Sequence, residues 1–209
     1  NTKIQRFKMT YPQFFDNIPK IKLQDDLASL LGAFEDGFIE YSYLDSVKSA
    51  GHSCPTVLGA YLMVLEGLKA LHEDETPKRG NILIEFKESQ TTGVAGVIGS
   101  VMTNITGSTT TNGFKGLAGK YDRNHLMNFE KNIDGASVRF TRLDTQKSVD
   151  VFYDASSISA HADMNFLMQK SVQGSATNEE KLEFGKLWQQ RVEDISNSVN
   201  KVIRVDIKE

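Results

Sequence analysis

The sequence predicts a fold with both helices and strands, in which a mixed sheet packs around a buried central helix. An almost wholly apolar helical segment follows Pro55, as expected for a helix covered on several sides. Segments in which apolar residues alternate with polar ones occur before and after it and indicate strands. A capping motif followed by one apolar stripe predicts a long amphipathic helix near the C-terminus.

The length and composition are those of an ordinary globular protein. With 209 residues, 39% hydrophobic and 24% charged, we expect residues 1–209 to form a single domain. There is no run of about 20 apolar residues and no apolar leader, so we expect a soluble protein without a membrane partner. Lys and Arg total 24 against 27 for Asp and Glu, and no basic block occurs, which disfavours nucleic-acid binding.

Cys54 is the sole cysteine, so the chain has no internal disulfide. A free thiol is typical of a reducing compartment, and a cytoplasmic location is therefore the expectation. The chain begins with Asn rather than Met, which leaves a cleaved leader open.

The first elements lead to the central helix. Residues 23–34 have apolar side chains at helical spacing and predict a short helix that Gly37 ends. Residues 38–43 alternate and predict a short strand or an extended segment. Pro55 suits the first position of a helix, because the amide it lacks would be unpaired there, and the helix is expected to continue to about His72.

The second half alternates between strands, helix and loop. Residues 81–87 predict a strand, residues 94–105 a Gly- and Ala-rich helix, and residues 106–120 a loop. Residues 137–143 and 148–153 read as the two strands of a hairpin.

Thr177 and Glu180 form a predicted capping box for the last helix. Its apolar stripe comprises Trp188, Val192, Ile195, Val199 and Val202. This stripe is expected to pack on the sheet or on a second subunit.

The candidate site is the segment Gly51–Pro55, which reads Gly-His-Ser-Cys-Pro. Cys54 directly precedes the central helix, where free amides and the positive end of the helix dipole favour a thiolate. His52 lies two residues earlier, so its imidazole and the thiol can be aimed into one cavity. Imidazole nitrogen and thiolate sulfur are both zinc ligands, and we predict a metal site at His52 and Cys54.

Two other interpretations stay open. Free cysteine is commonly buried and inert, so Cys54 can be a small core residue and His52 a loop residue. Alternatively, His52 activates Cys54 for metal-free nucleophilic catalysis, with the helix amides stabilising an oxyanion. A catalytic zinc site usually has three protein ligands, and the candidates for the third are His125, His161, Asp163 or a residue from a second copy of the chain.

The segment Gly51–Pro55 at the start of an apolar helix resembles the FmdE family, which takes its name from formylmethanofuran dehydrogenase. Three later segments resemble that family in the same order: a Thr-Gly turn at 106–109, a glycine-lysine loop at 113–117 and a strand at 135–139. The resemblance spans Tyr41 to Phe140.

This resemblance implies an α+β fold, commonly dimeric, with a small-molecule pocket around the His-x-Cys motif that holds a metal, typically zinc. The chain departs from the family pattern at several positions. Ala50 replaces a first His, Thr56 follows Pro55, and Ile98 and Ser100 stand where a Cys-x-Asp pair is common. The cysteine-rich zinc ribbon of some members is also absent from this sequence.

Two functions follow from the predicted site. One is a metal-binding protein, with zinc or another transition metal as the cofactor, in which catalysis at the metal is left open. The other is a non-catalytic carrier or accessory protein for a metal or a metallated cofactor such as haem. In both cases a homodimer is expected from the resemblance.

Overall fold

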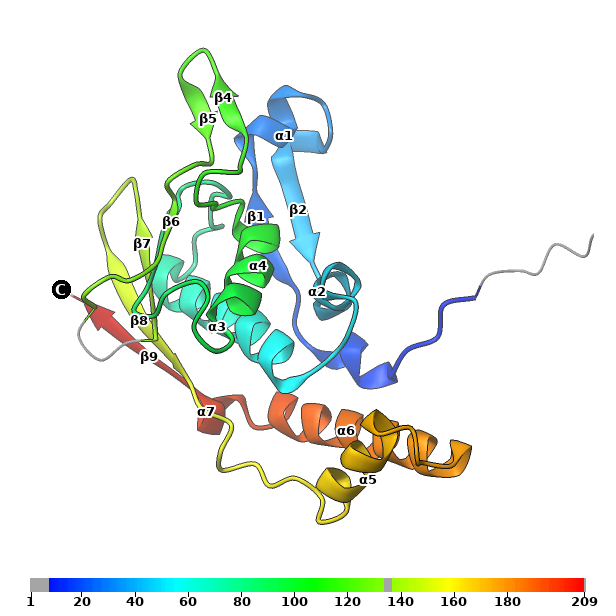
Figure 1. The fold of residues 1–209 in the computed structure, drawn as a ribbon. Helices are drawn as coiled ribbons and strands as arrows, with labels where there is room; N and C mark the ends of the chain where they lie inside the picture. The colour runs from blue at the N-terminus through cyan, green and yellow to red at the C-terminus, as the bar shows by residue number, and fades with distance from the viewer. Residues whose placement is uncertain (1–7, 134–136, 209) are drawn as a thin grey trace, which may run out of the picture.

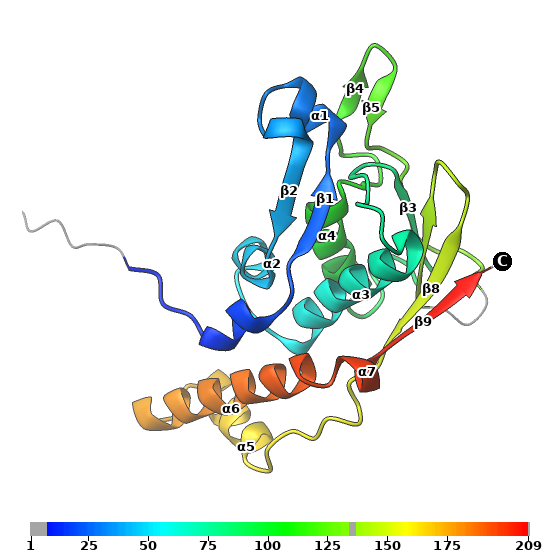
Figure 2. The same cartoon turned by 180° about the vertical axis from the view of Figure 1, so that it is seen from behind.

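The computed structural model describes residues 8–133 and 137–208. Figures 1 and 2 show the arrangement from opposite sides. The helical elements are η1 (Gln13–Asn17), α1 (Asp26–Leu30), η2 (Glu35–Gly37), α2 (Tyr43–Ala50), α3 (Pro55–His72), α4 (Ala95–Thr106), α5 (Met164–Val172), α6 (Asn178–Ser196) and α7 (Val199–Val202). The strands are β1 (Ile21–Gln24), β2 (Phe38–Tyr41), β3 (Ile82–Phe86), β4 (Lys115–Leu117), β5 (Lys120–Asp122), β6 (Met127–Asn128), β7 (Val138–Arg142), β8 (Ser148–Tyr153) and β9 (Ile203–Lys208).

The main sheet has five strands in the order β6-β3-β7-β8-β9. It is mixed, because β6 runs parallel to β3 while the other neighbours are antiparallel. The alternation that predicted its strands has the expected cause, since Ile84 and Val149 both face Phe140 across the ladders and all three are buried. The α+β fold predicted from the sequence is confirmed.

The helix α3 is the centre of the molecule. It lies against β7, β8 and β9 on one side, while α2, α4 and α6 pack on its other sides (Figures 1 and 2). Twelve of its eighteen residues are buried, which agrees with the helix predicted from Pro55 to His72. The N-terminus of α3 points toward α6, so the candidate segment lies between these two helices.

Two small antiparallel ribbons stand apart from the main sheet. One is β1-β2, and the other is the β4-β5 hairpin, which projects near α1 (Figure 1). The β4-β5 hairpin covers residues 115–122. Most of it lies within residues 106–120, for which the sequence predicted only a loop. Gly116 has a φ of +86°, and the backbone of Lys120 passes close to it, so only glycine fits this turn.

Two sequence predictions need correction. The helix predicted over residues 23–34 is reduced to α1, because Leu23 belongs to β1, where it pairs with Ile39 and is fully buried. The long C-terminal helix ends at Ser196, so the end of its predicted stripe belongs to α7 and the chain then turns into β9. The amphipathic helix α6 itself, with the Thr177–Glu180 capping box, is confirmed.

Candidate functional site

Cys54 is the residue that caps the N-terminus of α3. Its backbone is extended, with φ −152° and ψ 168°, and its Sγ accepts a hydrogen bond from the Val57 amide at 3.4 Å. The thiol thus occupies the position where Ser, Thr or Asp oxygens usually satisfy a free amide. The residue is partly exposed and packs against the hydrophobic core.

The residue before Cys54 anchors this segment to α6. The Ser53 carbonyl accepts hydrogen bonds from Trp188 Nε1 at 3.0 Å and from Gln189 Nε2 at 3.2 Å. Its hydroxyl is 2.8 Å from the hydroxyl of Tyr43, a fully buried residue whose pKa is raised by burial. These three bonds fix the backbone at Cys54 from two sides.

Tyr153, the last residue of β8, covers the first two turns of α3. Its hydroxyl donates to the Pro55 carbonyl at 2.7 Å. Burial raises the pKa of Tyr153 to about 12, and Cys54 lies near enough to contribute to that rise. The ring rests on Gly59, where an added Cβ would come 2.5 Å from Cζ and 2.7 Å from Cδ1 of Tyr153. Glycine at position 59 is therefore what allows the ring to approach the helix.

His52 is exposed, and its ring orientation is set by a backbone contact. Nδ1 lies 3.1 Å from the carbonyl oxygen of Ala50, which can only accept, so Nδ1 carries the hydrogen. In a neutral ring with this tautomer, Nε2 is the nitrogen that carries the lone pair. The imidazole lines a hollow of about 260 Å³ between the end of α2 and the outer side of α4; its other lining residues are Ser49, Ala50, Val97, Ser100, Val101 and Asn104.

The two predicted ligands share one loop but have different neighbours. His52 borders the hollow beside α4, and Cys54 is not among the residues that line it. The electrostatic neighbours of Cys54 are instead Tyr43 and Tyr153. Joint coordination of one ion by these two side chains stays a prediction.

The candidates for a third ligand lie in other parts of the fold. His125 is exposed in the loop between β5 and β6, with a φ of +59°. His161 is exposed before α5, where its Nδ1 accepts a hydrogen bond from the Asp163 amide at 3.3 Å. Among residues 8–133 and 137–208, no three His, Cys, Asp or Glu side chains are grouped so that they could hold a metal ion.

Arg191 is a residue near the site that sequence reasoning missed. It lies on α6 close enough to Tyr153 to favour the phenolate, although burial has the larger effect on that pKa. The available signal was its spacing, because Arg191 falls three residues after Trp188 and four before Ile195 in an otherwise apolar stripe.

A second group of charged side chains serves the fold. The Asp25 carboxylate caps α1 and pairs with Arg79 at 3.0 Å and with Arg123 at 2.8 Å. Burial alone would raise the pKa of Asp25, but hydrogen bonds and charges from both guanidinium groups outweigh it and hold the pKa low. Because every member has a partner, this cluster ties α1 to the β4-β5 hairpin and offers no free donor set.

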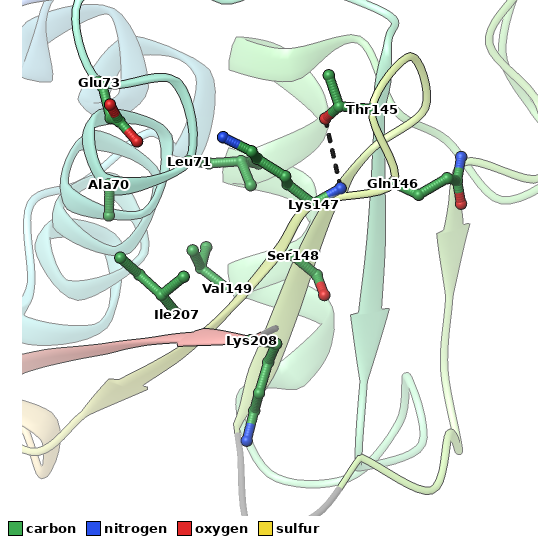
Figure 3. Close-up of a pocket in the computed structure, with 10 residues that line it drawn as sticks. All are labelled: Ala70, Leu71, Glu73, Thr145, Gln146, Lys147, Ser148, Val149, Ile207 and Lys208. Carbon is green, nitrogen blue, oxygen red and sulfur yellow. Dashed lines mark hydrogen bonds between the residues drawn. The ribbon is translucent and has the colours of Figure 1, made fainter.

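Another of the described hollows lies at the far end of α3, about 27 Å along the helix axis from Cys54. Its cavity volume is about 400 Å³. Figure 3 shows ten residues that line it, among them the apolar Leu71, Val149 and Ile207. Lys208, which also lines it, is engaged by Asp150 at 3.0 Å. This hollow has no connection with the predicted metal ligands.

In the part of the chain that the structure describes, no helix combines the length and apolar character needed to cross a bilayer. No curated protein shows a significant match to this chain. Residues 50–203 match a protein family described as "FmdE, Molybdenum formylmethanofuran dehydrogenase operon". The match begins at the candidate segment and extends beyond Phe140, where the resemblance was expected to end, through α6. Because it covers most of the 209 residues, the chain belongs to the FmdE family.

Proposed function

We propose that this protein binds a transition metal, in the first place zinc, through His52 and Cys54. The family description refers to the operon of a molybdenum enzyme, which supports a metal-associated accessory role. The observation that carries the proposal is the state of the His52 ring, which has one nitrogen held by a backbone carbonyl and the other free.

Metal-bound histidines usually donate their second ring N–H to a carbonyl or carboxylate, which fixes the tautomer and orients the ring. His52 makes this contact with Ala50 through Nδ1. Nε2 is therefore the nitrogen proposed to bind the metal. Its exposure beside the α4 hollow gives an ion and a small ligand a route to it.

Cys54 supplies the second donor type that zinc accepts. Its sulfur accepts the Val57 amide hydrogen bond at the N-terminal end of α3. The residue as a whole is partly exposed and packs against the hydrophobic core. A bound zinc ion would supply Lewis acidity toward a ligand oxygen.

Two protein ligands leave the remaining positions of the ion to water, a small molecule or a second copy of the chain. A closed structural zinc site has four protein ligands, and the described residues provide no third one near Cys54. Such an open shell lets a metal or a metallated cofactor exchange. This favours the carrier or accessory function, with haem as the redox-active alternative to zinc, over a structural site.

A homodimer is the proposed source of further ligands. The outer side of α4 beside His52 carries Val97, an apolar residue that is 41% exposed. A second copy covering this side would bring its own donors to the hollow. We also propose that residues 1–209 form one domain, since the hydrophobic core includes residues from Phe14 to Val202.

The test is metal analysis of protein loaded with zinc and then dialysed. Wild type is expected to keep zinc in a fixed ratio to the chain, while Cys54→Ser and His52→Ala lose it. His125→Ala is the matched control, because it removes an exposed loop histidine outside the candidate segment and is expected to keep the wild-type ratio.

Equal, negligible zinc in wild type and all variants would contradict the proposal. A visible absorption band that disappears in Cys54→Ser would identify a redox metal or haem instead of zinc. Light scattering on the same samples measures the molar mass of the protein in solution. If the protein holds metal as a monomer, a second copy of the chain does not supply ligands.

A further inference from the structure

The helix α6 presents a cation on the side that faces the core. Trp188, Val192 and Ile195 follow one another at helical spacing, and the last two are fully buried. Arg191 belongs to the same side and is itself partly buried. An arginine in this position needs a chemical reason, because charged side chains are rarely placed on a buried stripe unless they are paired.

Among the described residues, Arg191 has no partner that meets this need. Its Nε is enclosed by the protein and has no hydrogen-bond acceptor in that part of the chain. Across residues 8–133 and 137–208, no carboxylate lies within ion-pair distance of its guanidinium. A buried donor without a partner is costly and often marks the place of an ion or ligand.

The neighbours of Arg191 place it at the candidate segment. Its charge acts on Tyr153, whose hydroxyl is bound to Pro55 and whose pKa also responds to Cys54. The residues before it on α6, Trp188 and Gln189, hold the Ser53 carbonyl. The guanidinium and the N-terminus of α3 therefore contribute positive potential to the same side of the molecule.

We propose that Arg191 binds the oxyanion group of a small molecule, a carboxylate or a phosphate, next to Cys54. A guanidinium offers a planar set of donors that matches both groups, and Nε is the donor left without a partner. The ligand would supply the negative charge that the surrounding side chains do not. This inference rests on α6 and holds whether or not His52 and Cys54 bind a metal.

The single tryptophan of the chain provides the readout. Trp188 is one turn from Arg191, and its indole nitrogen is bound to the same segment, so charge and packing changes there alter its emission. Chelator-treated protein is titrated with sodium phosphate and, separately, with sodium acetate, with sodium chloride holding the ionic strength constant. A saturable change in emission is expected for at least one of the two anions.

The variants test whether Arg191 carries the binding. Arg191→Gln is expected to weaken binding about tenfold or more, because a charged hydrogen-bond donor is lost. Arg191→Lys keeps the positive charge but lacks the planar guanidinium. Its anion affinity is expected to lie between those of wild type and Arg191→Gln. Arg204→Gln is the matched control, since that exposed guanidinium lies over the Phe152 ring at 3.8 Å and is expected to leave the titration unchanged.

Saturation by one anion identifies the class of ligand and supports the proposal. The absence of a saturable response to both anions in wild type would overturn it, as would an equal response in Arg191→Gln. Zinc loading of Arg191→Gln separates this inference from the metal site. If Arg191→Gln retains zinc but no longer binds the anion, the result supports both the metal site and the anion site. If wild type binds phosphate saturably but holds no zinc, the result contradicts only the proposed metal site.

Discussion

Replacing Gly59 by alanine tests the packing that supports the candidate site. An alanine usually stabilises the interior of a helix by about 1 kcal/mol relative to glycine. At this position the new Cβ would meet the ring of Tyr153, 2.5 Å from Cζ and 2.7 Å from Cδ1, distances that no real methyl group tolerates. The ring must move away from α3, and its 2.7 Å hydrogen bond to the Pro55 carbonyl is lost.

The magnitude follows from three contributions. Overpacking of this kind costs about 1–3 kcal/mol, and the lost hydrogen bond costs about 1 kcal/mol more. The gain of about 1 kcal/mol in helix propensity offsets part of this. We expect Gly59→Ala to lower the free energy of unfolding by about 2 kcal/mol, which lowers Tm by about 4–8 °C in a protein of this size.

Gly185 provides the matched control on another helix. It lies in α6 with nothing within 4 Å of an added Cβ, so Gly185→Ala is expected to raise stability by up to about 1 kcal/mol. Both variants are unfolded in urea and followed by Trp188 emission and far-UV circular dichroism. If Gly59→Ala is as stable as wild type, Tyr153 does not rest on α3, and the described surroundings of Cys54 are wrong.

Two further perturbations address the fold at a distance from the site. Arg123→Ala removes a buried partner of Asp25 at 2.8 Å. It is expected to lower the free energy of unfolding in urea by about 3–5 kcal/mol. A decrease no larger than that of Arg204→Ala, which removes an exposed arginine, would contradict the role of this ion pair. Burial, helped by the charge of Arg142, holds the pKa of His72 below its usual range, so the unfolded chain binds the proton more readily as pH falls. Stability is therefore expected to decrease from about pH 6.5 downward, and His72→Gln to flatten this dependence in denaturant midpoints at pH 5, 6 and 7; parallel curves would refute this assignment.

The sequence by itself determined the elements whose signal is local. Pro55 and the apolar residues after it fixed the start and the burial of α3, because the proline and the missing amides restrict a helix end regardless of the rest of the chain. Alternation fixed β3 and β7, since one side of each strand is covered. The segment 148–153 was also predicted as a strand, but three consecutive residues of β8, from Val149 to Val151, are buried, so both sides of its middle are covered. The position of Cys54 as the cap of α3 follows from the same local rule.

Only the tertiary structure decided which distant segments meet. Leu23 has a helical pattern around it but belongs to β1, where it pairs with Ile39 of β2 and is fully buried. The partners of Asp25 include Arg123, 98 positions later in the chain. No local sequence pattern predicts that contact.

The same reason limits what could be predicted of the site. His52 and Cys54 were found because they are neighbours in the chain, whereas Arg191 acts on Tyr153 from another helix. Hydrogen bonds and charges act through space, and a sequence records only the order of residues along the chain. His52 and Cys54 could thus be predicted from the sequence. The position of Arg191 could be recognised only from the packing of α6 against α3.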